Sequence, residues 1–134
     1  MHNLSVRDKN FKKILEYLEN YSKEYFNIEC CALIGKNKNT YTAEFVANRS
    51  PDPNLFFCID PVDFLKFKNE NEIVCVFHSH PNSDETFSEQ DINNSEAVCL
   101  PFLIYSLVTN KFSLYEPKII ESNVNTLKKV KGLL

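Results

Sequence analysis

Two histidines, a serine and an aspartate lie close together in the sequence and together can bind a metal ion. His78, His80, Ser88 and Asp91 fall within fourteen residues, and Pro81 follows the second histidine. Alternate residues of an extended chain point to the same face, so both imidazoles can approach one ion. A carboxylate oxygen is a suitable third ligand for zinc. Three such ligands leave one coordination position open, as in hydrolytic zinc sites, whereas structural zinc sites are usually closed by four protein ligands.

The residues around this group predict the elements that position it. The apolar run 73–77 indicates a buried strand that leads into His78, and Pro81 ends the strand because proline cannot donate to a ladder. Residues 82–87 are predicted to form a polar loop, and Ser88 is suited to cap a helix whose first turn contains Asp91. A His-x-His pair alone is equally well explained by two exposed histidines at a strand end. The added proline, serine and aspartate favour the metal site.

This constellation resembles the JAMM (MPN-plus) metalloprotease family. The family pattern has a distant Glu, then H-[ST]-H-P, with seven residues between the second His and a Ser, and two more before an Asp. Residues 81–87 supply the seven and residues 89–90 the two. The resemblance implies that His78, His80 and Asp91 bind one zinc ion per chain, and that Ser88 hydrogen-bonds the reacting oxygen. It extends over most of residues 29–116 and is strongest to the compact bacterial and phage tail-assembly members.

The family also implies a glutamate on an early strand as the general base. Glu29 precedes an apolar run, whereas Glu24 falls in a predicted helix and Glu44 in the middle of a predicted strand, so Glu29 fits best. Zinc lowers the pKa of a bound water to about 7, and an ionised carboxylate can accept the proton of that water. Ser88 would then stabilise the developing oxyanion, and Glu29 would pass the proton to the leaving amine. The expected reaction is the hydrolysis of an amide or isopeptide bond.

The expected fold is a single α/β domain over residues 1–134. The resemblance implies a JAMM/MPN fold, which is cytidine-deaminase-like and has a mixed, curved β-sheet flanked by helices. The sequence pattern predicts strands at 29–34, 41–47, 55–59, 73–78, 100–108 and 112–115. It predicts a first helix capped by Ser5 with Asp8, a helix capped by Asp60 with Pro61 at its first position, and a C-terminal helix over 122–134. We expect the last helix to pack on the domain rather than to bind a partner.

Composition narrows the class of protein. The chain has 134 residues and a formal charge of −3, so it lacks the basic footprint of a nucleic-acid-binding protein. Its apolar runs are too short for a membrane span, and the polar start is unlike a signal peptide. Five cysteines are scattered without a C-x-x-C motif, and four of them lie within or beside apolar strands, which indicates buried free thiols in a reducing compartment. We therefore expect a cytoplasmic protein, in the host cytoplasm if a phage encodes it.

Other functions have to be weighed against the metal hydrolase. A Cys30 or Cys31 nucleophile lacks a visible activating arrangement, and a zinc deaminase lacks its paired-cysteine ligand motif here. A non-catalytic scaffold with the same fold is a further alternative. Two enzymatic roles compete: maturation of a phage tail protein, and deubiquitinase-like or desampylase-like release of a ubiquitin-like or sulfur-carrier protein. The motif does not separate these two roles.

Overall fold

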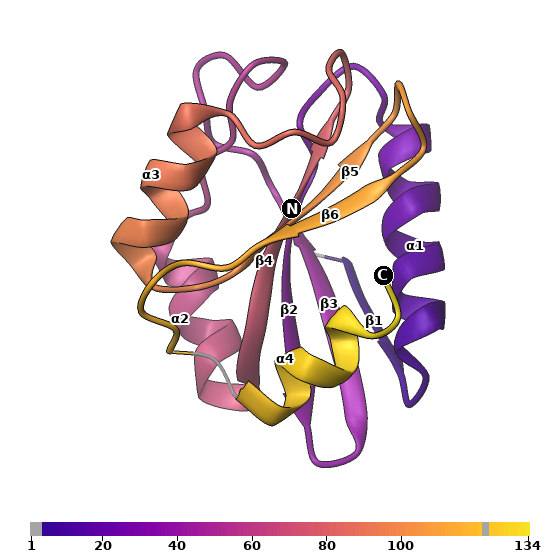
Figure 1. Ribbon diagram of the computed structural model, residues 1–134, viewed down its shortest axis with the longest axis vertical. Helices are drawn as coiled ribbons and strands as arrows, with labels where there is room; N and C mark the ends of the chain where they lie inside the picture. Colours follow the sequence, from indigo (N-terminus) through magenta and orange to yellow (C-terminus); the bar gives the residue numbers. More distant parts are fainter. Residues whose placement is uncertain (1–3, 122–123) are drawn as a thin grey trace.

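The computed structural model describes residues 4–121 and 124–134 as one β-sheet with helices on both faces (Figure 1). The strands are β1 (Leu4–Asp8), β2 (Cys31–Asn37), β3 (Thr40–Val46), β4 (Glu72–His80), β5 (Phe102–Ser106) and β6 (Phe112–Tyr115). The helices are α1 (Phe11–Glu24), α2 (Pro61–Glu70), α3 (Glu89–Val98) and α4 (Val124–Lys131).

The strand order is β1-β3-β2-β4-β5-β6. Neighbouring strands are antiparallel except β4 and β5, which run parallel. A parallel pair needs a crossover connection, and α3 provides it. The mixed, curved α/β sheet expected from the sequence is confirmed.

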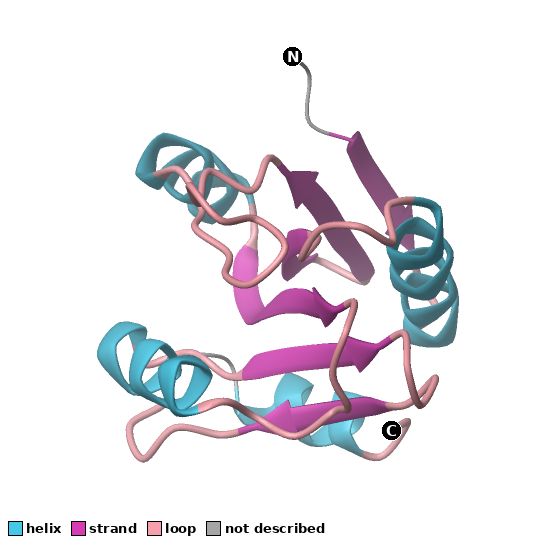
Figure 2. Ribbon diagram, turned by 90° about the horizontal axis from the view of Figure 1, so that it is seen from above, coloured by secondary structure: helices cyan, strands magenta, loops and turns pink. Residues whose placement is uncertain are grey.

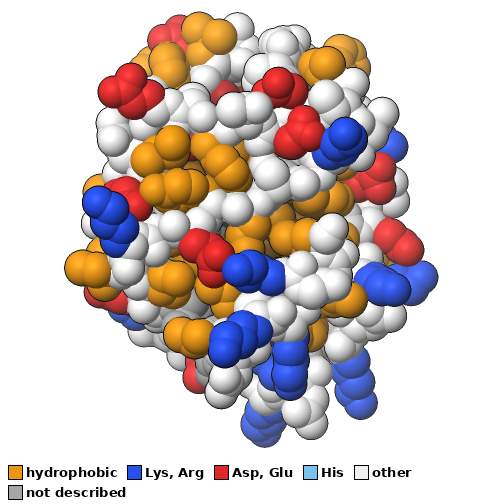
Figure 3. Space-filling view, in the orientation of Figure 1, with side chains coloured by type: hydrophobic (Ala, Val, Ile, Leu, Met, Phe, Trp, Pro, Cys, Tyr) orange, Lys and Arg blue, Asp and Glu red, His pale blue; other side chains and the backbone are white. Residues whose placement is uncertain are grey.

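The two faces of the sheet are covered by different helices (Figure 2). On one face, α1 buries Phe11, Ile14 and Leu18 against the strands, and α4 adds Val130 to the same core. On the other face, Phe67 of α2 packs with apolar side chains of the sheet and with Leu100, which lies between α3 and β5. Side chains alternate between these two faces along the strands, except in β4, where Val74 and Cys75 both join the first core. Lysine and arginine side chains gather around α4 and the nearby β2–β3 turn (Figure 3).

An irregularity in the β2–β4 pairing sets the register of the strand that carries the histidines. Ile34 pairs with Cys75, but Gly35 pairs with Ile73, so the register shifts at this point. Because a one-residue shift moves a side chain to the opposite face, the register fixes the face on which every residue of β4 lies. At Gly35 a Cβ atom would lie 2.8 Å from the Phe67 ring, so only glycine lets α2 pack this closely on β2.

Two expectations about secondary structure were wrong. Ser5 and Asp8 lie in β1, which pairs with β3, and the cap of α1 is Asn10, whose side chain accepts a hydrogen bond from the Lys12 amide at 3.0 Å. Residues 55–59 form no strand. The predicted strand at 29–34 begins only at Cys31, which leaves Glu29 just before it.

The other elements were predicted well. Asp60 caps α2 with Pro61 at its first turn, and β5 and β6 form an antiparallel pair. The predicted helix 122–134 is confirmed over Val124–Lys131, and its residues 122–123 lie outside the described part of the chain. Of the helices in residues 4–121 and 124–134, none combines the length and the hydrophobicity that a membrane span requires.

All five cysteines have free thiols, but only three of them are buried as expected. Cys30, Cys31 and Cys75 are buried, whereas Cys58 is exposed and Cys99 is partly exposed. Burial raises the pKa of the Cys30 thiol to about 11. A thiol that stays protonated at neutral pH is a poor nucleophile, which argues against the cysteine alternative at this position.

Candidate functional site

The site lies where β4 ends and α3 begins. His78 and His80 are on the face of β4 that α2 and α3 cover, the face to which Val76 also belongs. Asp91 lies in the first turn of α3, and the loop 81–88 folds the start of this helix back beside the strand. The structure thus brings together the two histidines and the aspartate that the sequence singled out, and all three are buried.

The distances between these side chains suit a shared ion. Asp91 Oδ1 lies 3.0 Å from His78 Nε2, and Asp91 Oδ2 lies 3.1 Å from His80 Nε2. Zinc ligands lie about 2.0–2.2 Å from the metal, so two ligands of one ion are at most about 4.4 Å apart. Both separations fall below this limit. One ligand atom from each of the three residues lies within 4.8 Å of the others, so the group can hold a metal ion.

The other ring nitrogen of His80 fixes the protonation of the imidazole. His80 Nδ1 lies 2.8 Å from the backbone oxygen of Asp84. A carbonyl oxygen can only accept a hydrogen bond, so Nδ1 carries the proton and is the donor. A proton on Nδ1 leaves the Nε2 lone pair for a metal, the arrangement commonly found for metal-binding histidines. Burial disfavours the charged form of His80, but the contacts with Asp91 and Asp84 outweigh it and raise the pKa of His80. When Nε2 also carries a proton it donates to Asp91 Oδ2 at 3.1 Å, and a bound cation would take the place of that proton.

His78 shows most directly that the site suits a metal. Its ring is fully buried and is stacked on Phe57, with ring centroids 4.3 Å apart and an interplanar angle of 21°. Within the described residues, neither of its ring nitrogens makes a hydrogen bond, although Nε2 faces Asp91. Buried polar atoms without a partner are rare and costly, and a metal ion would satisfy one of them. Burial also lowers the pKa of His78, which favours the neutral form that binds metals.

Ser88 and Asp91 form a reciprocal cap at the start of α3. The Ser88 hydroxyl accepts a hydrogen bond from the Asp91 amide at 3.0 Å, and the Ser88 amide donates to Asp91 Oδ2 at 3.0 Å. The nearby histidines and this amide overcome the effect of burial and hold the pKa of Asp91 well below its usual range. The cap therefore orients an ionised carboxylate toward the histidines. It also leaves the Ser88 hydroxyl proton free to be donated elsewhere.

Glu29 lies two residues before β2 begins and faces the same space. It lines a cavity of about 300 Å³ together with His80, Ser88 and Asp91. Burial raises the pKa of Glu29 to about 8 in the metal-free chain, while the charge of His80 lowers it and that of Asp91 raises it. A bound dication would add a strong positive charge, which favours the carboxylate form that a general base needs.

The two rival glutamates lie elsewhere. Glu24 is exposed at the end of α1. Glu44 lies in β3 and accepts a hydrogen bond from the Ser5 hydroxyl at 3.2 Å. Neither lines the cavity that Glu29, Ser88 and Asp91 share. The arrangement thus favours Glu29 among the three.

Asn48 supports the site but was not found from the sequence. Its side-chain amide donates to the backbone oxygens of Glu29 and Phe56 at 2.9 and 2.8 Å, and its oxygen accepts from the Cys58 amide at 3.0 Å. It therefore fixes both the backbone of Glu29 and the loop that carries Phe57. An asparagine in a loop gives no signal of such a role, because the partners that tie it to Glu29, Phe56 and Cys58 are 8 to 19 positions away.

Ser79 supports the site from the opposite face of β4. It is fully buried, and its hydroxyl accepts a hydrogen bond from the Cys30 amide at 2.8 Å. The Ser79 amide donates in turn to the Cys30 oxygen at 2.9 Å. These two bonds join the residue after Glu29 to the residue between the histidines, so they fix the position of the glutamate relative to the metal ligands.

Comparison with known proteins finds similarity both to a solved structure and to a protein sequence. A solution structure of a protein from Desulfitobacterium hafniense superposes with a TM-score of 0.59 at 20% identity, covering 85% of this chain and 93% of that one. Tail tip assembly protein K of Escherichia phage N15 is 22% identical over 107 residues, which are 80% of this chain and 44% of that protein. The chain thus spans less than half the length of this curated relative.

A family assignment follows from a longer match. Residues 12–117 match the family described as prokaryotic homologues of the JAB domain. This span includes Glu29, both histidines, Ser88 and Asp91, and it confirms the resemblance to compact bacterial and phage JAMM-like proteins. The protein is a member of the prokaryotic JAB-domain family.

Proposed function

We propose that this protein is a zinc-dependent peptidase or isopeptidase that hydrolyses an amide bond. The observation that carries the proposal is the convergence of His78, His80 and Asp91 on one point, with the buried His78 nitrogens left without hydrogen bonds. Two neutral imidazoles and a carboxylate are the donor set of an open, hydrolytic zinc site. Glu29 and Ser88 line the cavity beside this set.

Each residue has a distinct role in the proposed reaction. Zinc, when bound, supplies a Lewis acid that polarises a carbonyl and acidifies water. His78, His80 and Asp91 would hold the ion. Glu29 accepts a proton from the attacking water and returns it to the leaving amine, which is the work of a general base and then a general acid. The Ser88 hydroxyl donates a hydrogen bond to the developing oxyanion while its oxygen caps α3.

Metal content tests the ligand assignment. We expect about one zinc per purified wild-type chain, and loss of zinc in the double variant His78→Ala/His80→Ala, because only one ligand of the set would remain. Elemental analysis measures both proteins, and circular dichroism shows whether the variant is folded. Equal zinc in the two folded proteins would refute the metal site.

Activity tests the base. Glu29→Gln should keep zinc and fold but lose about 10²–10⁴-fold in hydrolysis, because an amide cannot accept the proton. Glu24→Gln and Glu44→Gln are the matched controls and should remain active. Full activity in Glu29→Gln, with loss in either control, would assign the role to another carboxylate.

We further propose that the substrate is a protein, with a phage tail protein favoured over a ubiquitin-like protein. The support is the likeness to a protein named for tail tip assembly. The inactive variant Glu29→Gln can retain substrate, and mass spectrometry of what it captures separates the two roles. A small protein ending in Gly-Gly would favour the ubiquitin-like role. If wild type cleaves neither kind of protein and binds one of them tightly, the non-catalytic scaffold is the better description.

A further inference from the structure

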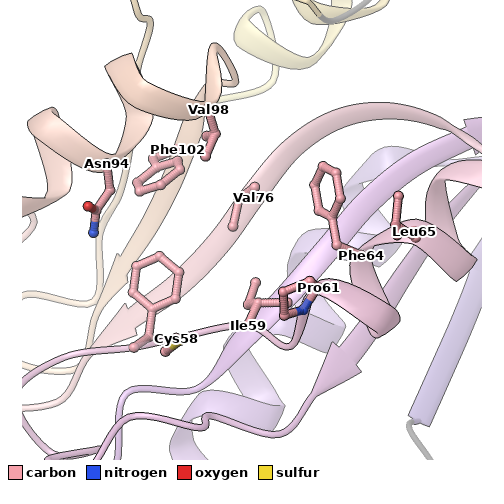
Figure 4. Close-up of a pocket in the computed structure, with 10 residues that line it drawn as sticks. Cys58, Ile59, Pro61, Phe64, Leu65, Val76, Asn94, Val98 and Phe102 are labelled. Carbon is pink, nitrogen blue, oxygen red and sulfur yellow. The ribbon is translucent and has the colours of Figure 1, made fainter.

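An apolar groove runs between α2 and α3 beside the candidate site (Figure 4). Its volume is about 480 Å³. Phe64 and Leu65 of α2 form one wall, Val98 of α3 forms the other, and Val76 and Phe102 of the sheet form the floor. Among the described residues that line it, Asn94 alone has a polar side chain other than a thiol.

The groove adjoins the cavity that Glu29 lines. Phe57 and Asn94 line both spaces, so a molecule in one space contacts the same two side chains as a molecule in the other. Phe57 also stacks on His78, which places the start of the groove directly beside the metal ligands. A peptide bound in the cavity would therefore have the groove within reach of a neighbouring side chain.

The rim of the groove exposes apolar side chains to solvent. Leu65 is 58% exposed and Val98 is 46% exposed. Apolar surface that lines a concavity gains most from covering by another apolar group, at roughly 25 cal/mol for each Å² removed from water. Concave sites lined mainly by apolar side chains, with a few polar groups, are the usual form of a binding site.

Asn94 provides a polar group at the junction of the two spaces. It follows Asp91 by three positions on α3, so both side chains lie on the same side of the helix. In Figure 4 its amide projects from α3 beside Phe102. No hydrogen bond to it is found within the described residues, and an amide offers both a donor and an acceptor, which match a peptide backbone. Its neighbour Asn93 is exposed and lines neither space.

We propose that the α2–α3 groove is the specificity pocket for the substrate. It receives a large apolar side chain of an extended peptide segment, and Asn94 hydrogen-bonds the backbone between that side chain and the scissile bond. Because an extended chain advances about 3.3–3.6 Å per residue and the two spaces share a wall, the apolar residue lies within about three residues of the cut. This inference rests on the proposed peptidase function.

Binding can be tested without catalysis. The probes are N-acetyl-leucinamide and N-acetyl-asparaginamide, added to the full chain with ¹³C-labelled methyl groups. We expect the leucine derivative to shift the methyl resonances of Leu65, Val76 and Val98 in a saturable manner, and the asparagine derivative to leave them unchanged. Leu65→Ser should weaken the response several-fold. Val62→Ser is the matched control on the same helix, because Val62 is 56% exposed but does not line the groove.

Cleavage tests the same pocket in the reaction. The substrate is a mixture of peptides from digested proteins, and mass spectrometry identifies the new termini. We expect a large apolar residue at one fixed position within about three residues of the cut, and a roughly ten-fold or greater loss of this preference in Leu65→Ser. Asn94→Ala should lower kcat/KM for all cleaved peptides, whereas Asn93→Ala should match wild type.

The two experiments distinguish failure of the pocket from failure of the proposed function. Cleavage without an apolar preference, together with no methyl response, would overturn the pocket and leave the peptidase standing. Binding of the leucine derivative without any cleavage would support the pocket and overturn the peptidase. Methyl shifts that depend on protein concentration in the absence of a probe would assign the groove to self-association and would also overturn the pocket.

Discussion

Replacing Ser88 separates the two roles that the structure gives this residue. Its hydroxyl accepts the Asp91 amide proton at 3.0 Å, and its own amide donates to Asp91 Oδ2 at 3.0 Å. Ser88→Ala removes the first bond and keeps the second. Loss of an N-cap costs about 0.5–2 kcal/mol of the unfolding free energy. For a chain of 134 residues, 1 kcal/mol lowers Tm by about 3–5 °C, so the expected decrease is about 2–10 °C.

The effect of the same change on turnover should be larger and should have another cause. If the hydroxyl proton stabilises the oxyanion, Ser88→Ala lowers kcat by about 10²–10³-fold. Zinc content should remain near that of wild type, because the backbone amide of residue 88 still orients Asp91. Ser88→Asp caps a helix as well as serine does but cannot donate a hydrogen bond. It should therefore keep the wild-type Tm and be nearly inactive.

Three measurements on each variant decide the result: thermal unfolding, zinc per chain, and cleavage of the peptide mixture. Asn10→Ala is the matched control, since Asn10 caps α1 with a similar bond, to the Lys12 amide at 3.0 Å, and lines no part of the catalytic cavity. It should lose stability and keep activity. If Ser88→Ala behaves like Asn10→Ala, with a lower Tm and normal turnover, Ser88 is only a cap. If Ser88→Asp gains metal affinity, its loss of activity says nothing about the oxyanion, and Ser88→Ala alone decides.

Three further changes probe the supporting structure. Because the pKa of Glu29 is raised from 4.5 to about 8 in the metal-free chain, the folded protein keeps a proton there that the unfolded protein has lost. Rising pH across this interval therefore destabilises the chelator-treated protein, by at most about 1.4 kcal/mol per pH unit. Glu29→Gln should show a smaller difference in Tm between pH 5 and pH 8, and an unchanged difference would contradict the burial effect. Ser79→Ala leaves the buried Cys30 amide without a partner and should cost about 1–3 kcal/mol in chemical denaturation, whereas a neutral result would mean that water replaces the bond. Gly35→Ala forces a Cβ to within 2.8 Å of the Phe67 ring and should cost about 1–3 kcal/mol, and a wild-type denaturation midpoint would show that α2 moves away freely.

The grouping of the three candidate metal ligands could be predicted because they are close in sequence. His78, His80 and Asp91 lie within one strand, one loop and the first turn of one helix, so strand alternation and helix capping suffice to place them. Glu29 required the family resemblance. Among three glutamates near the start of the chain, the predicted elements favoured Glu29 once the family pattern was applied, and in the structure Glu29 lines the cavity whereas Glu24 and Glu44 do not.

The errors arose where distant contacts outweigh local pattern. Residues 4–8 look like the start of a helix, but all five pair with β3 as strand β1. Asn10 caps α1 instead. Residues 55–59 have the composition of a strand. Their backbone groups bond Asn48 and Arg49, and Phe57 packs on His78, so no neighbouring strand is required. Neither outcome has a signal in the residues themselves.

The three candidate ligands lie close together along the chain, whereas Glu29 lies far from them. This difference predicts an order of events during folding. The three ligands belong to one short unit of β4, loop and α3, whereas Glu29 reaches them only after β2 has docked along β4. Short loops close sooner and at a lower entropic cost than long ones. Zinc uptake should therefore precede the recovery of hydrolysis when the protein refolds, and simultaneous recovery would argue against this order. Under the proposed function, a chain that bound its metal early would lack its general base, and so its activity, until the sheet is complete.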